Sequence, residues 1–277
     1  MKNLVKNLLG ITCCFIATQS FSQKLEKLWE TDSVFKVPES VLHDAKNKIL
    51  YVSNIDGLQP WEKDGKGSIG ILSEDGKNIV VDWVTGLESP KGMGLHKGKL
   101  YVADLTEIAV IDIDKAAIVK RIPVAGSVGL NDISIDKKGV IYVTDSKAKK
   151  VYRVINGKPE LLLENLNGPN GILVKGSIVY LLDAGGFFKM EKDKSLTKIA
   201  DGMEGGTDGI EQVKENEFII SCWQGAIWYV KKDGTKSLLL DTREEKKNTA
   251  DIGYNPKTKT VFVPTFWRNT VVAYKIN

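Results

Sequence analysis

The sequence predicts an all-β protein, specifically a six-bladed β-propeller of four-stranded blades. Three observations support this fold. A unit made of a short strand, a polar turn and a second strand recurs six times, at a spacing of about 40 residues. The last unit lacks one strand, and a spare strand stands near the start of the chain. The composition, 42% apolar and 27% charged over 277 residues, is that of a globular protein with a substantial core.

The first residues do not belong to the predicted propeller. Lys2 and Lys6 form a basic segment, residues 8–17 form an apolar one, and residues 20–22 place small side chains at a cleavage site. This order is typical of a secretory signal peptide, and the apolar stretch is too short to span a bilayer comfortably. We therefore expect residues 1–22 to be a signal peptide and residues 23–277 to form one propeller domain.

The chain is accordingly expected to be exported, either to the periplasm or out of the cell. A lipoprotein signal that uses Cys13 or Cys14 ranks second, and an uncleaved anchor ranks third. Cleavage would leave Cys222 as the only cysteine, so the mature chain could form no internal disulfide. Loss of the two leading lysines would lower the net charge from +4 to +2, which gives no support for nucleic-acid binding.

The repeated units align from their first strand onward. They are "PESVLHDAKNKILYVSN" (38–54), "PKGMGLHKGKLYVAD" (90–104), "GLNDISIDKKGVIYVTDS" (129–146), "PNGILVKGSIVYLLD" (169–183), "TDGIEQVKENEFIISCW" (207–223) and "ADIGYNPKTKTVFVPTF" (250–266). Each has a second strand rich in Val, Ile, Tyr or Phe, which are residues that favour strands. The spacing is stretched to 52 residues between the first two units, where an insertion follows the second strand.

Each unit continues with a third strand, and five units continue with a fourth. The sixth unit ends after its third strand, "TVVAYKI". The segment "KLEKLWETD" (24–32) is the candidate for the missing strand, because an N-terminal strand that completes the last blade closes the ring and protects the sheet edges. A β-sandwich would explain neither the sixfold period nor the spare strand.

One polar residue opens the first strand of every unit. These ring residues are Glu39, Lys91, Asn131, Asn170, Asp208 and Asp251. The innermost strands of a propeller line its central channel, so the six side chains should converge at one mouth. Each alone is best explained as a turn residue, but turn chemistry would also supply Gly and Ser, and it does not favour Glu or Lys.

Carboxylate and amide oxygens without Cys or His are ligands for a hard cation such as Ca²⁺. The ring therefore predicts a divalent-cation site. His43 and His96 both fall inside strands away from the ring, where packed or surface positions are expected.

A second polar set ends the second strands, at Asn54, Asp104, Asp145 and Asp183. We expect these side chains to cap turns through hydrogen bonds to the backbone. Asp145 and Asp183 could also orient ring residues. Asp132, which follows Asn131, is likewise interpreted as a turn residue.

The tryptophans divide into two groups. Trp29, Trp83 and Trp228 are expected to pack within blades. Trp61, Trp223 and Trp267 lie in connections at the predicted mouth, where they could rim a ligand pocket or pack between blades.

Three successive stretches, 129–146, 168–185 and 206–223, resemble blade motifs of the SMP-30/gluconolactonase/LRE-like family, whose relatives include paraoxonases and diisopropylfluorophosphatase. The resemblance implies a metal, usually calcium, held by Glu39, Asn170 and Asp208. Asn131 would be a further ligand or a substrate contact, and Asp208 a general base or nucleophile.

The chain departs from this family at three positions. Pro38–Glu39–Ser40–Val41 stands where gluconolactonases have Glu-Gly-Pro and an aromatic residue. Gly129 replaces an arginine that grips the sugar lactone, and Lys91 replaces the histidine of paraoxonases. Metal binding therefore carries over more fully than sugar specificity.

The resulting hypothesis is an exported, Ca²⁺-dependent hydrolase of a lactone or similar ester. Asp208 would activate water or attack directly, while Lys91 would stabilise negative charge or bind a substrate carboxylate. Asn131, Lys91, Asp251, Trp223 and Trp61 are the candidate substrate contacts. We expect a monomer with a small-molecule substrate, no nucleic-acid partner and no membrane span. The alternative is a non-catalytic propeller that binds a ligand or protein on its top face.

Overall fold

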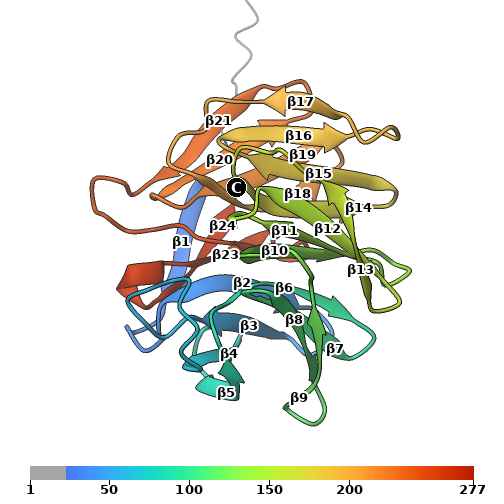
Figure 1. Ribbon diagram of the computed structural model, residues 1–277. Helices are drawn as coiled ribbons and strands as arrows, with labels where there is room; N and C mark the ends of the chain where they lie inside the picture. The colour runs from blue at the N-terminus through green and yellow to red at the C-terminus, as the bar shows by residue number, and fades with distance from the viewer. Residues whose placement is uncertain (1–22) are drawn as a thin grey trace, which may run out of the picture.

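Twenty-four strands form six four-stranded antiparallel sheets in the computed structural model, which describes residues 23–277 (Figure 1). Each sheet is one blade, so the prediction of a six-bladed propeller with four-stranded blades is confirmed. The predicted signal peptide, residues 1–22, lies outside the described residues.

The first five blades each take four consecutive strands from the innermost to the outermost. Blade 1 comprises β2 (Pro38–Asp44), β3 (Ile49–Asn54), β4 (Gly67–Ser73) and β5 (Ile79–Leu87). Blade 2 comprises β6 (Pro90–His96), β7 (Lys99–Asp104), β8 (Glu107–Asp112) and β9 (Ala117–Pro123). Blade 3 comprises β10 (Leu130–Ile135), β11 (Ile141–Asp145), β12 (Lys150–Ile155) and β13 (Lys158–Leu163).

The remaining blades follow the same plan, except that the sixth recruits the N-terminal strand. Blade 4 comprises β14 (Pro169–Lys175), β15 (Ile178–Asp183), β16 (Gly186–Met190) and β17 (Leu196–Ala200). Blade 5 comprises β18 (Thr207–Lys214), β19 (Glu217–Cys222), β20 (Ala226–Lys231) and β21 (Lys236–Asp241). Blade 6 comprises β22 (Gly253–Asn255), β23 (Thr260–Pro264), β24 (Val271–Ile276) and β1 (Leu25–Glu30), with the short 3₁₀ helix η1 (Phe266–Arg268) before β24.

The apolar core lies between the blades rather than at the centre of the molecule. Six buried apolar clusters each join one pair of neighbouring blades, and together they run around the whole ring. A sheet whose strands alternate apolar and polar side chains exposes one face to solvent, whereas each of these blades buries both faces against its neighbours. The innermost strands touch one another in ring order, from β2 through β6, β10, β14 and β18 to β22 and back to β2.

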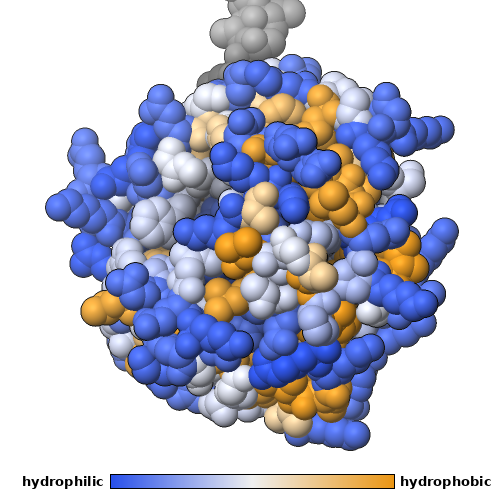
Figure 2. All heavy atoms as spheres, in the orientation of Figure 1, coloured by the Kyte–Doolittle hydropathy of each residue, from blue (hydrophilic) through white to orange (hydrophobic). Residues whose placement is uncertain are grey.

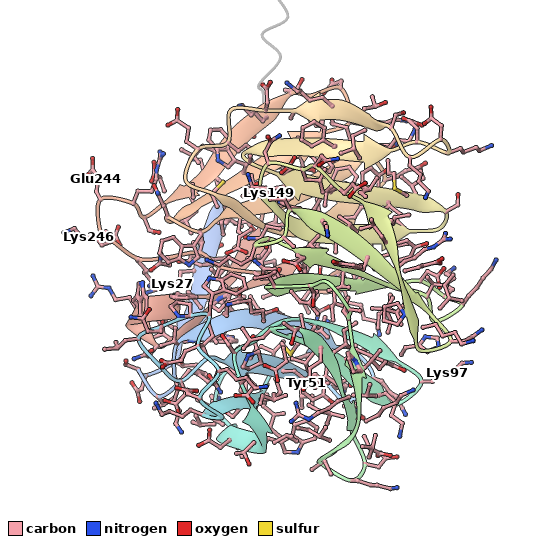
Figure 3. All side chains as sticks on the ribbon, in the orientation of Figure 1. Lys27, Tyr51, Lys97, Lys149, Glu244 and Lys246 are labelled. Atoms are coloured by element: carbon pink, nitrogen blue, oxygen red, sulfur yellow. The ribbon has the colours of Figure 1, made fainter. Side chains whose placement is uncertain are left out.

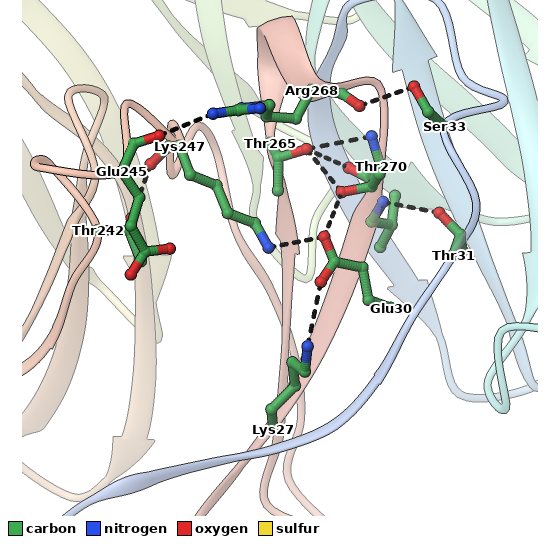
Figure 4. Close-up of polar contacts among 11 residues, drawn as sticks. Lys27, Glu30, Thr31, Ser33, Thr242, Glu245, Lys247, Thr265, Arg268 and Thr270 are labelled. Carbon is green, nitrogen blue, oxygen red and sulfur yellow. Dashed lines mark hydrogen bonds and ion pairs between the residues drawn. The ribbon is translucent and has the colours of Figure 1, made fainter.

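The ring is closed by β1, which pairs antiparallel with β24 from Leu25↔Ile276 to Glu30↔Val272. Figure 1 shows the blue N-terminal strand beside the red C-terminal one. The predicted closing segment, 24–32, is thereby confirmed. Side chains reinforce the seam: Glu30 Oε1 accepts hydrogen bonds from Lys247 Nζ at 2.6 Å and from Thr270 Oγ1 at 3.1 Å (Figure 4).

Charged side chains cover the outside of the ring. Figure 3 shows Lys97 at the tip of a turn and Glu244 and Lys246 on an outlying loop, while Tyr51 lies inside blade 1. On the face drawn in Figure 2, hydrophobic residues form separate small patches among hydrophilic ones. Within residues 23–277, no helix has the length and apolar character needed to cross a bilayer.

Candidate functional site at the channel mouth

A recurrent β-bulge positions the ring residues at the mouth of the channel. In each of the first five blades the pairing between the first two strands shifts register at the start of the inner strand. A bulge re-aims the side chains next to it. The side chains at the bulge therefore point toward the channel instead of into the core between blades. They are Glu39, Lys91, Asn131, Asn170 and Asp208.

The inner strands pack so closely at this level that the following residue is usually small. A Cβ added to Gly171 would lie 2.3 Å from the carbonyl oxygen of Asp208, and one added to Gly209 would lie 2.5 Å from Asp251 Oδ1. Real Cβ atoms do not approach so closely, so glycine is needed there to let the strands meet. The small residues after Glu39, Lys91, Asn170 and Asp208 thus let the inner strands converge.

Glu39 and Lys91 form an ion pair that is almost fully buried. Lys91 Nζ lies 3.8 Å from Glu39 Oε1, and the two residues are 2% and 4% exposed. Burial lowers the pKa of Lys91, against the opposing charges of Glu39 and Asp208. Burial raises the pKa of Glu39, although the Lys91 charge partly offsets this. Two charges removed from water in this way stabilise each other, so loss of either one would leave the other buried without its ion-pair partner.

Asp208 and Asn170 lie across the mouth from this pair, on β18 and β14. Asp208 is 2% exposed. Burial, followed by the charges of Glu39 and Asp251, raises the pKa of Asp208 well above its usual range, while Lys91 and the Asn170 side chain act in the opposite sense. The carboxyl group therefore lies in a site that already holds negative charge.

Three buried oxygen atoms of this cluster have no hydrogen-bond partner: Glu39 Oε2, Asn170 Oδ1 and Asp208 Oδ1. They come from three different blades. Buried polar atoms are nearly always paired, and an unpaired one costs roughly 1–3 kcal/mol. A cation or a hydrogen-bond donor between the three acceptors would remove this cost.

Asn131 is held by a chain of hydrogen bonds. Its Nδ2 donates to Ser146 Oγ at 2.9 Å, and Ser146 Oγ donates to the carbonyl oxygen of Pro169 at 2.6 Å. This chain links blades 3 and 4 beside Asn170. The bond fixes which end of the Asn131 amide faces Ser146.

Asp132 and the ring residue Asp251 line the channel cavity, which the other five ring residues do not reach. Asp251 Oδ2 accepts a 2.5 Å hydrogen bond from Ser40 Oγ, and its backbone bridges Ser40 instead of continuing a bulged strand. Asp132 accepts backbone N–H bonds from Ile133 at 2.6 Å and Ile172 at 2.7 Å. The interpretation of Asp132 as a turn residue is wrong, since it lies within β10 and is buried.

These two aspartates share one electrostatic environment. Burial raises the pKa of each carboxyl group well above its usual range. The charge of Asp251 raises the pKa of Asp132 further, and the charge of Glu39 raises the pKa of Asp251 further. They line a channel cavity of about 260 Å³ whose walls also include Ser134, Lys175 and Glu211. Of the six ring residues, Asp251 alone lines it.

The residues that end the second strands cap the loops before the inner strands, as predicted. Asp145, fully buried, accepts backbone N–H bonds from Val128, Gly129 and Ala148 at 2.7–3.0 Å. Equivalent bonds tie Asp104 to Glu88 and Ser89, Asp183 to Asn167 and Gly168, and Asn54 to Lys36. The capped loops lead directly into the ring residues, so these side chains set the position of the ring.

Trp61 covers part of the mouth. Lys91 Nζ lies 4.2 Å from the centroid of its ring, and Lys147 Nζ lies 5.0 Å from it. The insertion that carries Trp61 is anchored by Ser89 Oγ, which donates to the carbonyl oxygen of Pro60 at 2.6 Å.

The other tryptophans and the two histidines differ in how they pack. Trp223 is stacked edge-on against Phe266 at 5.4 Å, beside a small buried cluster at the top of blades 1 and 6, and Trp267 is 41% exposed. Trp29, Trp83 and Trp228 pack against the blade clusters, as predicted. His43 is buried against Glu74, and His96 contacts the turn at Gly139, both away from the ring.

Lys147 also lies at the mouth, although it is not among the residues predicted from the sequence. It follows Asp145 and Ser146 in the connection after a second strand, which is the same type of loop that carries Trp223. The register of the repeats would have placed it at the mouth. Among residues 23–277, no three His, Cys, Asp or Glu side chains gather as a metal site, so a cation here would rely on two carboxylates and on amide oxygens.

Comparisons with known proteins show similarity of fold. A structural-genomics target with a provisional gluconolactonase assignment superposes with a TM-score of 0.71 at 13% identity, over 93% of each chain. A catalytically inactive virginiamycin B lyase from Staphylococcus aureus, with quinupristin, gives 0.64 at 11% identity over 92% of this chain and 99% of the lyase. A chain of the nidogen/laminin complex gives 0.65 at 18% identity over 79% and 84%.

No protein-family model matches the chain, and no curated protein matches it either. At such low identities the structural similarities establish the propeller alone. The resemblance to the SMP-30/gluconolactonase/LRE-like family stays a prediction.

Proposed function

We propose that this protein is a divalent-cation-dependent hydrolase that opens a lactone or a similar ester at the channel mouth. One observation carries the proposal: Glu39 Oε2, Asn170 Oδ1 and Asp208 Oδ1 are buried without hydrogen-bond partners at the meeting point of three blades. The structural similarity to a chain with a provisional gluconolactonase assignment is consistent with such an activity.

The donor set fits a hard cation. All three atoms are oxygens, two of them from carboxyl groups, and Ca²⁺ accepts such ligands in flexible geometry. Lys91 does not prevent this arrangement, because it faces Glu39 Oε1 and leaves Oε2 free. Glu39, Asn170 and Asp208 would therefore hold the cation, with Asn131 as a fourth ligand or a substrate contact.

A bound cation of this kind polarises a carbonyl group and stabilises the negative charge that develops on its oxygen. The protein's own groups supply the rest. Asp208 accepts a proton from the attacking water or attacks directly. Lys91 donates a hydrogen bond to negative charge on the substrate, and Asn131, fixed by Ser146, orients the substrate. Trp61 excludes water from the Lys91 side of the site.

Hydrolysis assays with lactones and aryl esters, with and without EDTA, test the proposal. Asp208→Asn and Glu39→Gln should lose at least about 100-fold in kcat/KM, and EDTA should abolish wild-type turnover. Glu62→Gln removes an exposed charge from the insertion on the same face and is the matched control. Equal rates in wild type and Asp208→Asn, or no turnover above background, would refute the hydrolase.

The second candidate is a non-catalytic propeller that binds a ligand or protein on its top face. It is favoured by the closed state of the mouth, where Lys91 is 2% exposed beneath an anchored Trp61. The chain of the nidogen/laminin complex has the same type of fold. Absence of turnover together with calcium-independent ligand binding would support this candidate over the hydrolase.

We also propose export, on the strength of the basic and apolar segments at the N-terminus. N-terminal sequencing of the protein recovered from the native host should show a mature end near residue 23. Recovery of a chain that still begins at Met1 would contradict cleavage.

A further inference from the structure

Two lysines converge on Trp61 at the edge of the mouth. Their Nζ atoms lie 4.2 Å and 5.0 Å from the ring centroid, so the two ammonium groups are within about 9 Å of one another. The indole ring of Trp61 is held in place, because Ser89 Oγ donates a hydrogen bond to the carbonyl oxygen of the neighbouring Pro60. Like charges gathered on one fixed aromatic ring repel each other, and an anion placed between them would remove that cost.

The backbone of blade 3 is shaped to admit Lys147. A Cβ on Gly129 would lie 2.4 Å from Lys147 Cγ and 2.8 Å from Trp61 Cζ3. Because Gly129 has no side chain, the aliphatic part of Lys147 can pass over the residue before β10. The Lys147 side chain thereby reaches the mouth beside Asn131. Asp145 fixes this loop through the N–H groups of Gly129 and Ala148.

The two lysines at the mouth have few carboxylate partners at ion-pair distance. Within the described part of the chain, Lys147 has no ion pair, and Lys91 has only Glu39, at 3.8 Å. With a divalent cation in the proposed site, Glu39 and Asp208 together neutralise it. Lys91, which is buried, and Lys147, which is exposed, then lack a carboxylate of their own at ion-pair distance, although the charge of Asp104 still acts on Lys91.

We infer that the substrate of the proposed hydrolase carries a carboxylate in addition to its lactone or ester group, and that Lys147 and Lys91 bind that carboxylate at the edge of Trp61. This inference rests on the proposed function, because the cation is what neutralises the two acidic side chains. Charged hydrogen bonds from two ammonium groups suit a carboxylate. A cation held by Glu39, Asn170 and Asp208 would polarise the acyl oxygen of the same substrate.

Hydrolysis of such a lactone has a simple balance. Water adds its oxygen to the acyl carbon, the ring C–O bond breaks, and the departing ring oxygen takes a proton to become a hydroxyl group. The product is a hydroxy dicarboxylic acid, and one proton is released at neutral pH. A pH-stat therefore follows the reaction directly.

The test compares γ-butyrolactone-γ-carboxylate with its carboxamide, which differs in charge but not in shape. Wild type in calcium should prefer the carboxylate by about tenfold or more in kcat/KM. Lys147→Gln should remove most of that preference, and Lys147→Arg should retain it. Lys138→Gln, which removes an exposed charge from a turn at the other end of β10, should leave the preference unchanged.

Calorimetric binding of 2-hydroxyglutarate in the presence of calcium separates the two proposals. Binding that weakens about tenfold in Lys147→Gln, without hydrolysis of any lactone, would uphold the anion site and refute the hydrolase. Equal or faster hydrolysis of the carboxamide would refute the anion site and uphold the hydrolase. Failure of 2-hydroxyglutarate to bind, with no lactone preference, would also overturn the anion site.

Discussion

Asp208 occupies a position that is unfavourable for the stability of the cation-free protein. It is almost fully buried, one of its oxygens has no partner, and its nearest charges include Glu39 and Asp251. A carboxylate held there raises the free energy of the folded protein until a cation joins it. The residue therefore couples the stability of the propeller to the proposed ligand.

In calcium-free buffer at pH 8, Asp208→Asn should raise the free energy of unfolding by about 1 kcal/mol, because it removes a buried charge at nearly constant shape. In saturating calcium the order should reverse, since only the wild type gains binding energy. Urea unfolding in EGTA and in calcium measures both. A variant that is less stable than wild type in EGTA would show that the charge of Asp208 is already balanced.

Glu211, on the wall of the channel cavity, makes stability depend on pH. Burial raises its pKa to about 7, against the opposing effect of Lys175, so the folded protein keeps a proton that the unfolded chain loses near pH 4.5. This contribution to stability is complete below about pH 4.5 and is lost as the pH rises to about 7.

Glu211→Gln should therefore gain stability over wild type across this interval, by on the order of 2 kcal/mol at pH 8. Urea unfolding of both proteins at several pH values between 4 and 8 gives the difference directly. A difference that does not change with pH would contradict the account.

Much of the ring could be predicted from the sequence, because the repeats share one register. Lys91, Asn131 and Asp208 fall at equivalent positions of their units, and the structure brings them to one mouth. Which side chains line the channel cavity could not be predicted. Alternation along a strand does not reveal a bulge, and the cavity-lining positions of Asp132 and Asp251 follow from the bulges and from the bridge to Ser40.

At the scale of elements, the carboxyl groups that end the second strands hold the loops before the inner strands. Asp145 is the most heavily used, with three backbone N–H donors. The residue type and position were enough to predict this role, since Asp commonly accepts hydrogen bonds from nearby backbone. What the sequence could not reveal is that the same loop also carries Lys147 across Gly129.

Asp145→Ala should lower the free energy of unfolding by about 3 kcal/mol, because one buried and two partly buried N–H groups lose their acceptor. Asp145→Asn keeps one acceptor oxygen and should lose less than half as much. Thermal and urea unfolding measure both variants. Equal losses in the two variants would show that side-chain volume, and not hydrogen bonding, accounts for the effect.

For the whole molecule, closure by β1 is the feature that unites the two ends of the chain. It completes blade 6 and contributes Trp29 to the cluster between blades 6 and 1. The closing strand was predictable because the repeat count left one strand spare. The hydrogen bonds that Glu30 accepts from Lys247 and Thr270 join residues more than 200 positions apart. They could not be predicted from local sequence patterns.

Deletion of residues 23–31 should expose the edge of β24 and open the ring. We expect a loss of at least about 10 °C in the melting temperature together with self-association, detected by size-exclusion chromatography. Glu26→Gln, an exposed change on the same strand, should alter neither quantity. A deletion variant that stays monomeric with an unchanged melting temperature would show that β1 is not needed for closure.

We propose that three unpaired oxygens at the channel mouth form a cation site. Isothermal titration of the calcium-free protein with Ca²⁺ tests it most directly, using wild type, Glu39→Gln, Asp208→Asn and the control Glu62→Gln. The account predicts one site per chain in wild type and in Glu62→Gln, and at least about 100-fold weaker binding in the other two variants. Absence of calcium binding in wild type, or equal binding in all four proteins, would contradict it.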